Sequence, residues 1–408
     1  MDKRIKILYI EQPLNNRGDE SAHRGIMHWL NSNRPDIDIE VIFWDESECN
    51  IREFIVDNPN NKYTNIKTVK GAHFALINGM KHPLLWDIHP TTHHILSLMK
   101  QSDYILCSPG GVNMGGFQSW EHVALLKMAA KINKPTIYYG RSIGPFPTET
   151  DKHKSFLKIS TELLKNFTYL SVRDRISSQT LHEMGIKHSL TVDCAFLSDV
   201  SQTISPDIKS KIGDDYAVIV PNVLHWHYDF KTLPHNRILD FYTNLFRRLR
   251  NEFPGLNFVL LPQTYNEISY LRKDFNFFKE IEAVLNDPKI VVLPETIGSD
   301  IQQDIIRHAK FMFGSRYHSV IFAINQATPF AALSYEHKIH GLLDILDLSD
   351  QGISISASDF NDDDSINQLV ENSISRIKNA DIEKIKTAQK QAKEMATSKI
   401  KELSNIIK

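Results

Sequence analysis

The chain has 408 residues, enough for two or three domains with separate hydrophobic cores. Its hydrophobic fraction of 41% and charged fraction of 24% are typical of a folded globular protein and exclude general disorder. The net charge is 47 − 49 = −2, which argues against a general nucleic-acid-binding protein, so we expect no nucleic-acid partner.

The N-terminus leads directly into a strand-like segment at residues 5–10. This segment is too short and too rich in β-branched residues for the central region of a signal peptide. No segment reaches the roughly 18–20 uninterrupted apolar residues of a membrane span. The three cysteines, Cys49, Cys107 and Cys194, lie too far apart for a disulfide framework or a CxxC metal pair. These features together predict a cytoplasmic protein.

Short β-rich segments alternate with helical patterns in the first half of the chain, which is typical of βαβ units on a parallel sheet. We expect strands at residues 5–10, 103–108, 135–139, 169–173 and 190–192, and helices at 20–30, 120–131, 153–164 and 177–184. This series predicts an N-terminal Rossmann-like domain over residues 1–200.

A second series of similar length follows a polar stretch at 198–213, which contains Pro206 and is interpreted as the linker. We expect strands at 217–220, 258–261, 290–293, 311–314 and 329–333, and helices at 236–250, 276–285, 299–308 and 319–325. The series predicts a second Rossmann-like domain over residues 214–365.

The last segment, residues 366–408, is predicted to be helical, and from 381 onward apolar residues recur at helical spacing. This tail carries seven lysines against four acids, and a basic amphipathic helix can lie on an anionic membrane. Packing of the narrow apolar stripe on the domains is the interpretation we prefer. The acidic loop at 359–364 lacks the glycine and the terminal glutamate of a calcium loop, so it is interpreted as a helix-capping loop.

Two loops of the first domain follow predicted strands and enter helices. The loop at 15–20 contains Asn16 and Asp19 but lacks the GxGxxG and Walker spacings, so a binding loop and a tight turn both remain open. The loop at 108–117 contains four glycines, which allow the backbone to approach a ligand closely. A hydroxyl-rich or phosphate-bearing group would suit this loop, and a plain connector is the alternative.

Two arginines follow the next strands of the same domain, Arg141 after 135–139 and Arg173 after 169–172. The carboxyl ends of parallel strands meet at one edge of a sheet, where α/β proteins bind ligands. Arginine there offers a planar fork for a carboxylate or a phosphate. The alternative for Arg173 is a structural ion pair with Asp174 or Asp193.

The most informative constellation lies in the second domain. The strand at 311–314 delivers Ser315, Arg316 and His318 to the start of a helix, where backbone amides favour anions. Lys338 follows the next parallel strand and is expected beside this loop. A fixed cation, a titratable imidazole and a second cation at one edge predict a site for a small, highly charged anion. His225 and His227 lack carboxylate or thiol partners at ligand spacing, so they are interpreted as part of a structural or acceptor-binding loop.

An ordered set of weak motifs runs from about residue 9 to residue 344. In chain order they are Asn16-Arg17-Gly18-Asp19, the glycine-rich loop at 108–116, Ser142-Ile143-Gly144-Pro145, Ser171-Val172-Arg173-Asp174 with Ser178, Leu181, Gly185 and Asp193, and Ser315-Arg316-x-His318 followed by Pro329 and Lys338. This set resembles the polysaccharide pyruvyl transferase family. The chain departs from the family pattern at Cys194, where proline is usual, and at Ser108-Pro109, where the glycine loop usually opens with glycine.

The resemblance implies an α/β fold of glycosyltransferase-B type, two Rossmann-like domains facing a cleft with a C-terminal helix. It also implies transfer of a pyruvyl group from phosphoenolpyruvate to two hydroxyls of a sugar in a bacterial surface-polysaccharide precursor. On this hypothesis His318, Arg316 and Lys338 are catalytic, and Arg173, Arg316, Ser315 and Lys338 bind the donor. The acceptor is expected on Asn16, Asp19, Gly110, Gly111, Asn113 and Arg141. No metal or cofactor is required, because the cations can supply the charge.

The expected partners are phosphoenolpyruvate and a sugar acceptor, with a lipid-linked oligosaccharide as the expected form and a peripheral contact at the inner face of the cell membrane. The alternative enzyme is a nucleotide-sugar-dependent glycosyltransferase of the same architecture, with Glu295 or Glu336 holding the ribose. A sugar-binding protein without chemistry is the third hypothesis. Protection against thermal unfolding by phosphoenolpyruvate or by a nucleotide sugar distinguishes the two enzymes.

Overall fold

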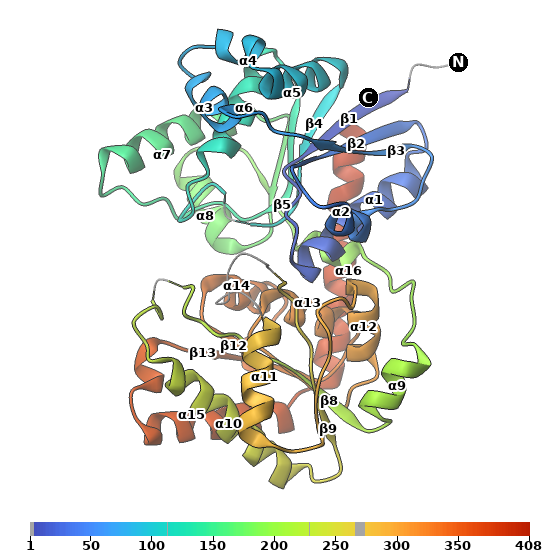
Figure 1. Ribbon diagram of the computed structural model, residues 1–408, viewed down its shortest axis with the longest axis vertical. Helices are drawn as coiled ribbons and strands as arrows, with labels where there is room; N and C mark the ends of the chain where they lie inside the picture. The colour runs from blue at the N-terminus through green and yellow to red at the C-terminus, as the bar shows by residue number, and fades with distance from the viewer. Residues whose placement is uncertain (1–3, 112, 228, 266–273) are drawn as a thin grey trace. The chain divides into compact units, whose positions relative to one another are not determined.

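The computed structural model describes residues 4–111, 113–227, 229–265 and 274–408. These residues form two compact α/β units, each built on a parallel sheet (Figure 1). Unit 1 comprises Met1–Leu14, Asp19–Ser198 and Glu394–Lys408, and unit 2 comprises Asn15–Gly18 and Asp199–Lys393. The short segment Asn15–Gly18 therefore leaves unit 1 and packs with the second sheet.

Within its described residues, unit 1 contains a seven-stranded sheet in the order β3-β2-β1-β4-β5-β6-β7. The strands are β1 (Ile5–Ile10), β2 (Ile37–Trp44), β3 (Asn61–Ile66), β4 (Tyr104–Cys107), β5 (Thr136–Arg141), β6 (Tyr169–Val172) and β7 (Ser189–Leu190). The helices are α1 (Arg17–Asn33), α2 (Glu48–Phe54), α3 (Ala72–Asn78), α4 (Leu84–Ile88), α5 (Pro90–Gln101), α6 (Trp120–Lys131), α7 (Asp151–Leu164), α8 (Arg175–Glu183) and the 3-10 helix η1 (Cys194–Leu197).

The strand order of unit 1 reverses between β1 and β4, which pair in parallel from Ile7 opposite Tyr104 to Ile10 opposite Cys107. This reversal is the topological switch point of a doubly wound sheet, beside which ligands bind. The core behind it packs both strands against α5 and α6, with Leu8, Ile105 and Val123 almost fully buried. The sheet therefore presents the loops after β1 and β4 on a rigid base.

Unit 2 repeats this plan with a six-stranded sheet, within its described residues, in the order β10-β9-β8-β11-β12-β13. The strands are β8 (Tyr216–Val220), β9 (Asn257–Leu260), β10 (Ile290–Val292), β11 (Met312–Gly314), β12 (Phe330–Ser334) and β13 (Gly352–Ser354). The helices are α9 (Pro206–Ile212), α10 (His235–Glu252), α11 (Asp274–Leu285), α12 (Ser299–Arg307), α13 (Tyr317–Asn325), α14 (His337–Ile345) and α15 (Asp363–Lys378), with 3-10 turns η3 (Ser349–Gln351) and η4 (Ala357–Phe360). Its switch point lies between β8 and β11.

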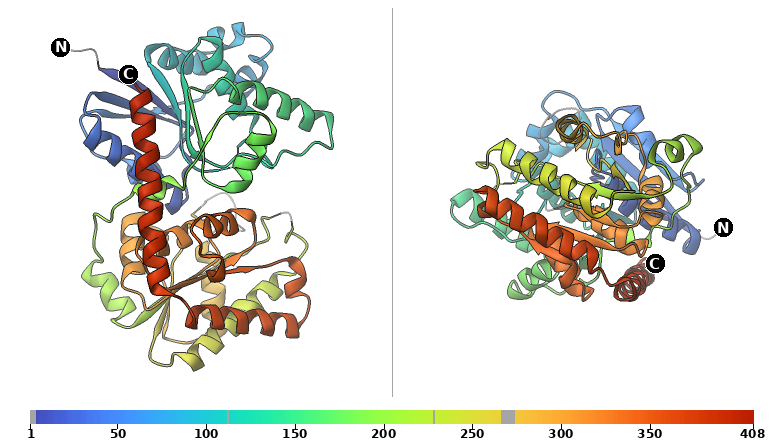
Figure 2. Two further views of the ribbon diagram at one scale, coloured as in Figure 1. Left: turned by 180° about the vertical axis from the view of Figure 1, so that it is seen from behind. Right: turned by 90° about the horizontal axis from the view of Figure 1, so that it is seen from below.

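The C-terminal helix α16 (Ile382–Ile406) is one continuous helix, shown in red in Figure 2. Its predicted apolar stripe is buried, from Ile385 through Ala396 to Leu403. The backbone carbonyl of Ala396 accepts a hydrogen bond of 2.8 Å from the Tyr139 hydroxyl in unit 1, and Gln389 donates one of 2.6 Å to Asn325 O in unit 2. The stripe thus packs on the protein, as the preferred interpretation predicted. No helix in the described ranges is both long enough and apolar enough to cross a membrane.

Other sequence-based expectations are refined by the structure. The acidic loop caps helices: Asp359 forms a capping box with Ser356, and Asp362 accepts a hydrogen bond from the Ser365 amide at the start of α15. The stretch interpreted as a linker contains the short helix α9. Strands β2, β3 and β13 and helices α2 to α5 and α14 were not predicted. Among them β3 is a polar edge strand, and α2, α3 and α4 are only 7, 7 and 5 residues long.

Candidate functional site

Three loops bring polar and charged side chains to one edge of the unit 2 sheet. They follow the neighbouring strands β8, β11 and β12, in which Gly314 pairs with Val220 on one side and with Ala332 on the other. Because these strands are parallel and in register, their carboxyl ends lie together. The loop after β11 carries Arg316 and His318, and α14 after β12 begins with His337 and Lys338. The structure thus brings the predicted cationic set to one edge.

Arg316 is anchored by a buried acid that the sequence analysis did not identify. Asp274, at the start of α11, accepts a hydrogen bond from Arg316 through Oδ1 and bonds of 2.9 Å from the amides of Gln263 and Thr264 through Oδ2. Its side chain is only 1% exposed, and that of Arg316 is 11% exposed. One carboxylate therefore fixes both the guanidinium and the loop after β9.

The guanidinium of Arg316 retains capacity to bind a ligand. Both of its hydrogen bonds, to Asp274 and to Thr264, are donated by Nη2, and its buried Nε has no partner among the described residues. Burial opposes the charge, but the charge and hydrogen bond of Asp274, together with Tyr335 and Tyr242, outweigh it, and the pKa of Arg316 is raised. A buried, permanently charged donor without a full set of partners is suited to a carboxylate or a phosphate.

Aromatic side chains pack beside the Arg316 guanidinium. The Arg316 guanidinium carbon lies 5.9 Å from the ring centre of Trp226, and Trp226 packs edge-on against Tyr335 at 5.6 Å. His227 also packs edge-on against Tyr335, at 5.5 Å, and burial lowers its pKa. The His225–His227 loop, expected to be structural or acceptor-binding, therefore forms one side of the candidate anion site.

His318 lies in the first turn of α13, two residues after Arg316, and is 8% exposed. A glycine far away in sequence makes room for it. A Cβ atom on Gly18 would lie 1.8 Å from Cγ of the imidazole, so only glycine fits there. The glycine of the Asn16-Arg17-Gly18-Asp19 motif is thus explained by its contact with His318 rather than by a ligand.

The rest of that motif segment also packs on unit 2. The side chain of Asn16 accepts a hydrogen bond of 2.8 Å from the Gly18 amide, and its backbone forms a β-bridge with Thr264. Arg17 is almost fully buried, with its guanidinium 4.1 Å from the ring centre of Tyr265. Asn16, expected with the first-domain loops, therefore lies with the loops around Arg316 in unit 2.

Two further residues of unit 2 that were predicted to bind the donor substrate, Lys338 and Ser315, differ in their surroundings. Lys338 lies 3.4 Å from Glu336, and the two side chains are 14% and 10% exposed, so its charge is partly balanced and partly available. Ser315 is fully buried, and its hydroxyl contacts Tyr242 Oη at 2.8 Å and donates to Val220 O at 3.0 Å. Ser315 therefore holds the β11 loop in place.

Arg173, predicted to bind the donor, lies in unit 1. Its guanidinium pairs with Asp193 and donates a 2.9 Å hydrogen bond to Ser142, and the side chain is 3% exposed. This is the ion pair that the sequence analysis gave as the alternative. The pairing and the burial hold Arg173 in an ion-pair network of unit 1, and its contact with the donor stays a prediction.

The predicted acceptor residues of unit 1 gather after β1, β4 and β5. Gly110 has a φ of 110°, and a Cβ there would lie 2.7 Å from Oδ1 of Asp19, so the glycine loop packs directly on the motif aspartate. Gly110 also bridges to Arg141, which is buried and donates hydrogen bonds to Ser108. Asp19, Gly110 and Arg141 are thus together, with Arg141 beneath the loop. Gly111 and Asn113 follow in the same loop, and both are half-buried.

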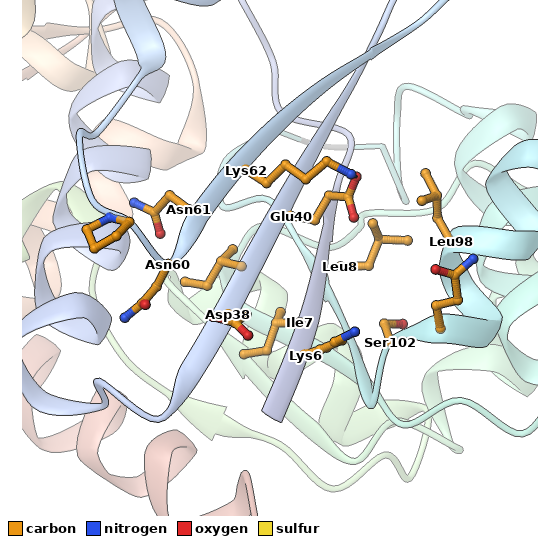
Figure 3. A pocket seen from close by; sticks show the side chains of 13 residues that line it. Lys6, Ile7, Leu8, Asp38, Glu40, Asn60, Asn61, Lys62, Leu98 and Ser102 are labelled. Atoms are coloured by element: carbon orange, nitrogen blue, oxygen red, sulfur yellow. The ribbon is translucent and has the colours of Figure 1, made fainter. Parts of the chain in front are cut away.

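A hollow of about 330 Å³ in unit 1 lies at the opposite end of the strands (Figure 3). It is lined near the starts of β1 and β2 by Lys6 and Asp38, and Lys62 pairs with Glu40 at 2.7 Å on its wall. Ligands of doubly wound sheets bind at the carboxyl ends instead. Among the described residues, no group of three or more His, Cys, Asp or Glu side chains is placed to hold a metal ion.

Two Rossmann-like units of this order define a glycosyltransferase-B-like α/β protein. Solved structures with the same fold include a UDP-GlcNAc 2-epimerase from Methanocaldococcus jannaschii, at a TM-score of 0.58 and 12% identity over 98% of this chain and 99% of that one. A glycosyltransferase from Rickettsia africae matches at a TM-score of 0.56 and 13% identity, over 99% of each chain.

The profile of the family described as "Polysaccharide pyruvyl transferase" matches residues 16–337. The chain belongs to the polysaccharide pyruvyl transferase family. A curated relative, the amylovoran biosynthesis protein AmsJ of Erwinia amylovora, is 23% identical over 389 residues, which cover 86% of this chain and 89% of the relative. The match spans both units, so the family resemblance inferred from the motifs is confirmed.

Proposed function

We propose that this protein transfers a pyruvyl group from phosphoenolpyruvate to two hydroxyls of one sugar, forming a cyclic ketal in a surface-polysaccharide precursor. The observation that carries the proposal is the anion site of unit 2, where Arg316 keeps a buried N–H without a described partner next to His318. Family membership supports the transferred group, and the name of the relative AmsJ supports a role in exopolysaccharide synthesis.

The donor carries a carboxylate and a phosphate, so its binding site needs several positive groups. Arg316 offers a planar fork, the amides that open α13 point outward, and Lys338 supplies a second cation. In our proposal Arg316 binds the carboxylate or the phosphate, and Lys338 neutralises charge that develops on the leaving phosphate. The Asp274 anchor keeps the guanidinium in place before the donor arrives, which lowers the entropy cost of binding.

His318 is the proposed proton donor in the first chemical step. Its imidazolium protonates C3 of the enol while a sugar hydroxyl adds at C2. The C2–O bond to phosphate then breaks, and the second hydroxyl of the same sugar adds at C2 and closes the ketal. The proton of the first hydroxyl leaves with the phosphate, and the proton of the second hydroxyl restores the imidazolium of His318, so the histidine is unchanged after one turnover.

The acceptor is proposed to bind unit 1 near Asp19, Gly110, Gly111 and Asn113, where hydroxyls can reach carboxylate and backbone groups. We propose a lipid-linked oligosaccharide as the acceptor, approached from the cytoplasmic face of the membrane. We also propose that no metal or cofactor takes part, because arginine and lysine supply the positive charge. Full activity after exhaustive chelation is expected, and a loss restored by one divalent ion would overturn the metal-free proposal.

Two measurements test the proposed function. Phosphoenolpyruvate should raise the melting temperature of the protein, whereas UDP- and GDP-sugars should not. Incubation with phosphoenolpyruvate and lipid-linked oligosaccharides should add the mass of one pyruvyl ketal to the product. Protection by a nucleotide sugar alone, together with transfer of its sugar, would instead identify the glycosyltransferase alternative.

A further inference from the structure

Glu11 follows β1 at the switch point of unit 1, a position for which the family motifs assign no role. Its backbone is held in place, because the Ser108 hydroxyl after β4 donates a 2.5 Å hydrogen bond to the Glu11 carbonyl. Its φ is 58°, in the left-handed region that residues with a side chain rarely adopt. Such backbone geometry costs stability and is concentrated at functional sites.

The carboxylate of Glu11 ends a chain of buried polar groups. Oε2 of Glu11 bonds to Nδ1 of His122 on α6, and Nε2 of His122 bonds to the hydroxyl of Tyr138 on β5. Both His122 and Tyr138 are almost fully buried. Burial lowers the pKa of His122 well below its ordinary value, so its imidazole is neutral. Its one proton is then placed on Nδ1 toward the carboxylate, and the Tyr138 hydroxyl donates to Nε2.

The other carboxylate oxygen is available. No hydrogen bond to Oε1 of Glu11 is found within the described ranges, and the side chain keeps 15% of its surface exposed. Burial raises the pKa of Glu11 to about 7, against the opposing charge of Arg141. The charged and titratable groups around it are His122 and Glu121 on α6, Arg141 and Tyr138 on β5, and Cys107 on β4.

We infer that Glu11 is the general base that deprotonates the first acceptor hydroxyl, and that His122 and Tyr138 position its carboxylate. This inference rests on the proposed function. Glu11 takes the hydroxyl proton as the C2–O bond forms, and the π electrons of the enol take a proton from His318 at C3. When the C2–O bond to phosphate breaks, the departing phosphate oxygen takes the proton of Glu11, directly or through water. Together with the return of the second hydroxyl proton to His318, this restores both side chains.

The test compares wild type with the isosteric variant Glu11→Gln, using 4-nitrophenyl glycosides of glucose, galactose and mannose as probe acceptors. Glu11→Gln should lower turnover by about 10²–10⁴-fold, the range for a lost general base. Its affinity for phosphoenolpyruvate, measured by titration calorimetry, should stay within about twofold of wild type, which also shows that the variant is folded. The matched control is Glu121→Gln, because Glu121 neighbours Glu11 but is 44% exposed and lies outside the hydrogen-bond chain.

The pH dependence of turnover separates a base from a structural carboxylate. Below pH about 7 a base with the raised pKa of Glu11 is protonated and inactive, so wild-type turnover should fall with pH there. Glu11→Gln should lose this decline of turnover at low pH (the acid limb), and Glu121→Gln should keep it. The donor phosphate also titrates near about pH 6, but it does so equally in every variant. His122→Asn removes the imidazole that orders the carboxylate, and it should displace the limb rather than abolish it.

The outcomes distinguish a failure of the proposed function from a failure of the role of Glu11. If wild type neither binds phosphoenolpyruvate nor adds pyruvyl mass to a glycoside, the proposed function fails and the inference about Glu11 fails with it. If wild type transfers the group and Glu11→Gln keeps near-normal turnover with the same acid limb, Glu11 is not the base and the proposed function stands. Loss of turnover and of the limb, with donor affinity intact, supports the inference.

Discussion

The two units place opposite charges beside the switch point of the same topology, but on different flanking strands. In unit 2 the loop after β11, beside the switch point, presents Arg316 and His318. In unit 1 the loop after β1, beside its switch point, presents the carboxylate of Glu11. Strand order fixes where a ligand binds, and the side chains delivered there fix which ligand it is. A cationic edge suits a phosphorylated carboxylate, and a carboxylate suits the hydroxyl that must lose a proton.

Each unit also holds its charged group against a buried partner, which is charged in unit 2 and neutral in unit 1. Arg316 is paired with Asp274, which raises the pKa of the guanidinium. Glu11 is held by a neutral imidazole, and burial raises its pKa despite the nearby charge of Arg141. The first arrangement keeps a permanent charge in place, and the second keeps a carboxylate able to exchange its proton near neutral pH. The difference predicts that Arg316 binds an anion with a permanent charge, whereas Glu11 exchanges a proton near neutral pH.

The largest expected effect is that of His318→Ala. Without the proton donor at C3, turnover should fall by about 10²–10⁴-fold, with little change in phosphoenolpyruvate affinity. Turnover from product mass and affinity from calorimetry check this, with the melting temperature as a control for folding. A stable His318→Ala variant with near-normal turnover would remove the histidine from the mechanism and leave unit 2 a binding site only.

Arg316→Ala should act on donor binding instead. The charge-assisted contact it removes is worth about 1.5–3 kcal/mol, or roughly 10–100-fold in affinity. Arg316→Lys should recover only part of the loss, because a point charge cannot reproduce the planar fork. Calorimetric titration with phosphoenolpyruvate measures both variants. If both bind the donor as wild type does, the guanidinium serves its ion pair with Asp274 and the anion site lies elsewhere.

Gly18→Ala should lower turnover by a smaller factor, because it disturbs the packing of His318. The added Cβ would overlap the imidazole of His318, so the ring must move. A displacement of about 1 Å can cost up to about 10²-fold in rate, and we expect roughly tenfold, with unfolding made easier by about 1–3 kcal/mol. Gly255→Ala is the matched control, because nothing lies within 4 Å of its Cβ position and it lies outside the proposed site. Equal turnover in the two variants would contradict the contact between Gly18 and His318.

Much of the fold and part of the site could be predicted from the sequence. Physical reasons explain why the remaining features could not. Strand β1 and helix α6 were predicted with their observed bounds, because buried parallel strands are continuous apolar segments and α6 is capped by Ser119. Arg316 and His318 were found because they directly follow a clear strand. Asp274 lies 42 residues before Arg316, and no local pattern signals that the two meet.

Glu11 shows a second limit of sequence reasoning. Its role depends on His122, 111 residues later, and on the burial that raises its pKa, and neither is visible in the residues around it. Arg173 shows the same limit. Its position after a strand predicted a ligand contact, which stays a prediction, and the fold also pairs its guanidinium with Asp193. Sequence position places a residue at an edge of the sheet, but tertiary partners decide whether its charge is available.

The smallest expected effect is on stability, and it tests whether the Glu11 carboxylate is retained for function. Because burial raises its pKa in the folded protein to about 7, the folded state holds the proton more tightly than the unfolded state does. The stabilising contribution of Glu11 is therefore complete below its unfolded pKa and is lost as the pH rises through about 7. Glu11→Gln stays neutral at every pH and avoids this loss.

At pH 8 the variant should melt at a higher temperature than wild type, by an amount equivalent to up to about 3 kcal/mol, and at pH 5 the difference should shrink toward zero. Melting curves at both pH values, with Glu121→Gln as the reference for an exposed carboxylate, measure this. A gain in stability at pH 8 combined with a loss of turnover would mark Glu11 as a group kept for chemistry at a cost to the fold, whereas a destabilised variant at both pH values would mark it as a structural partner of His122.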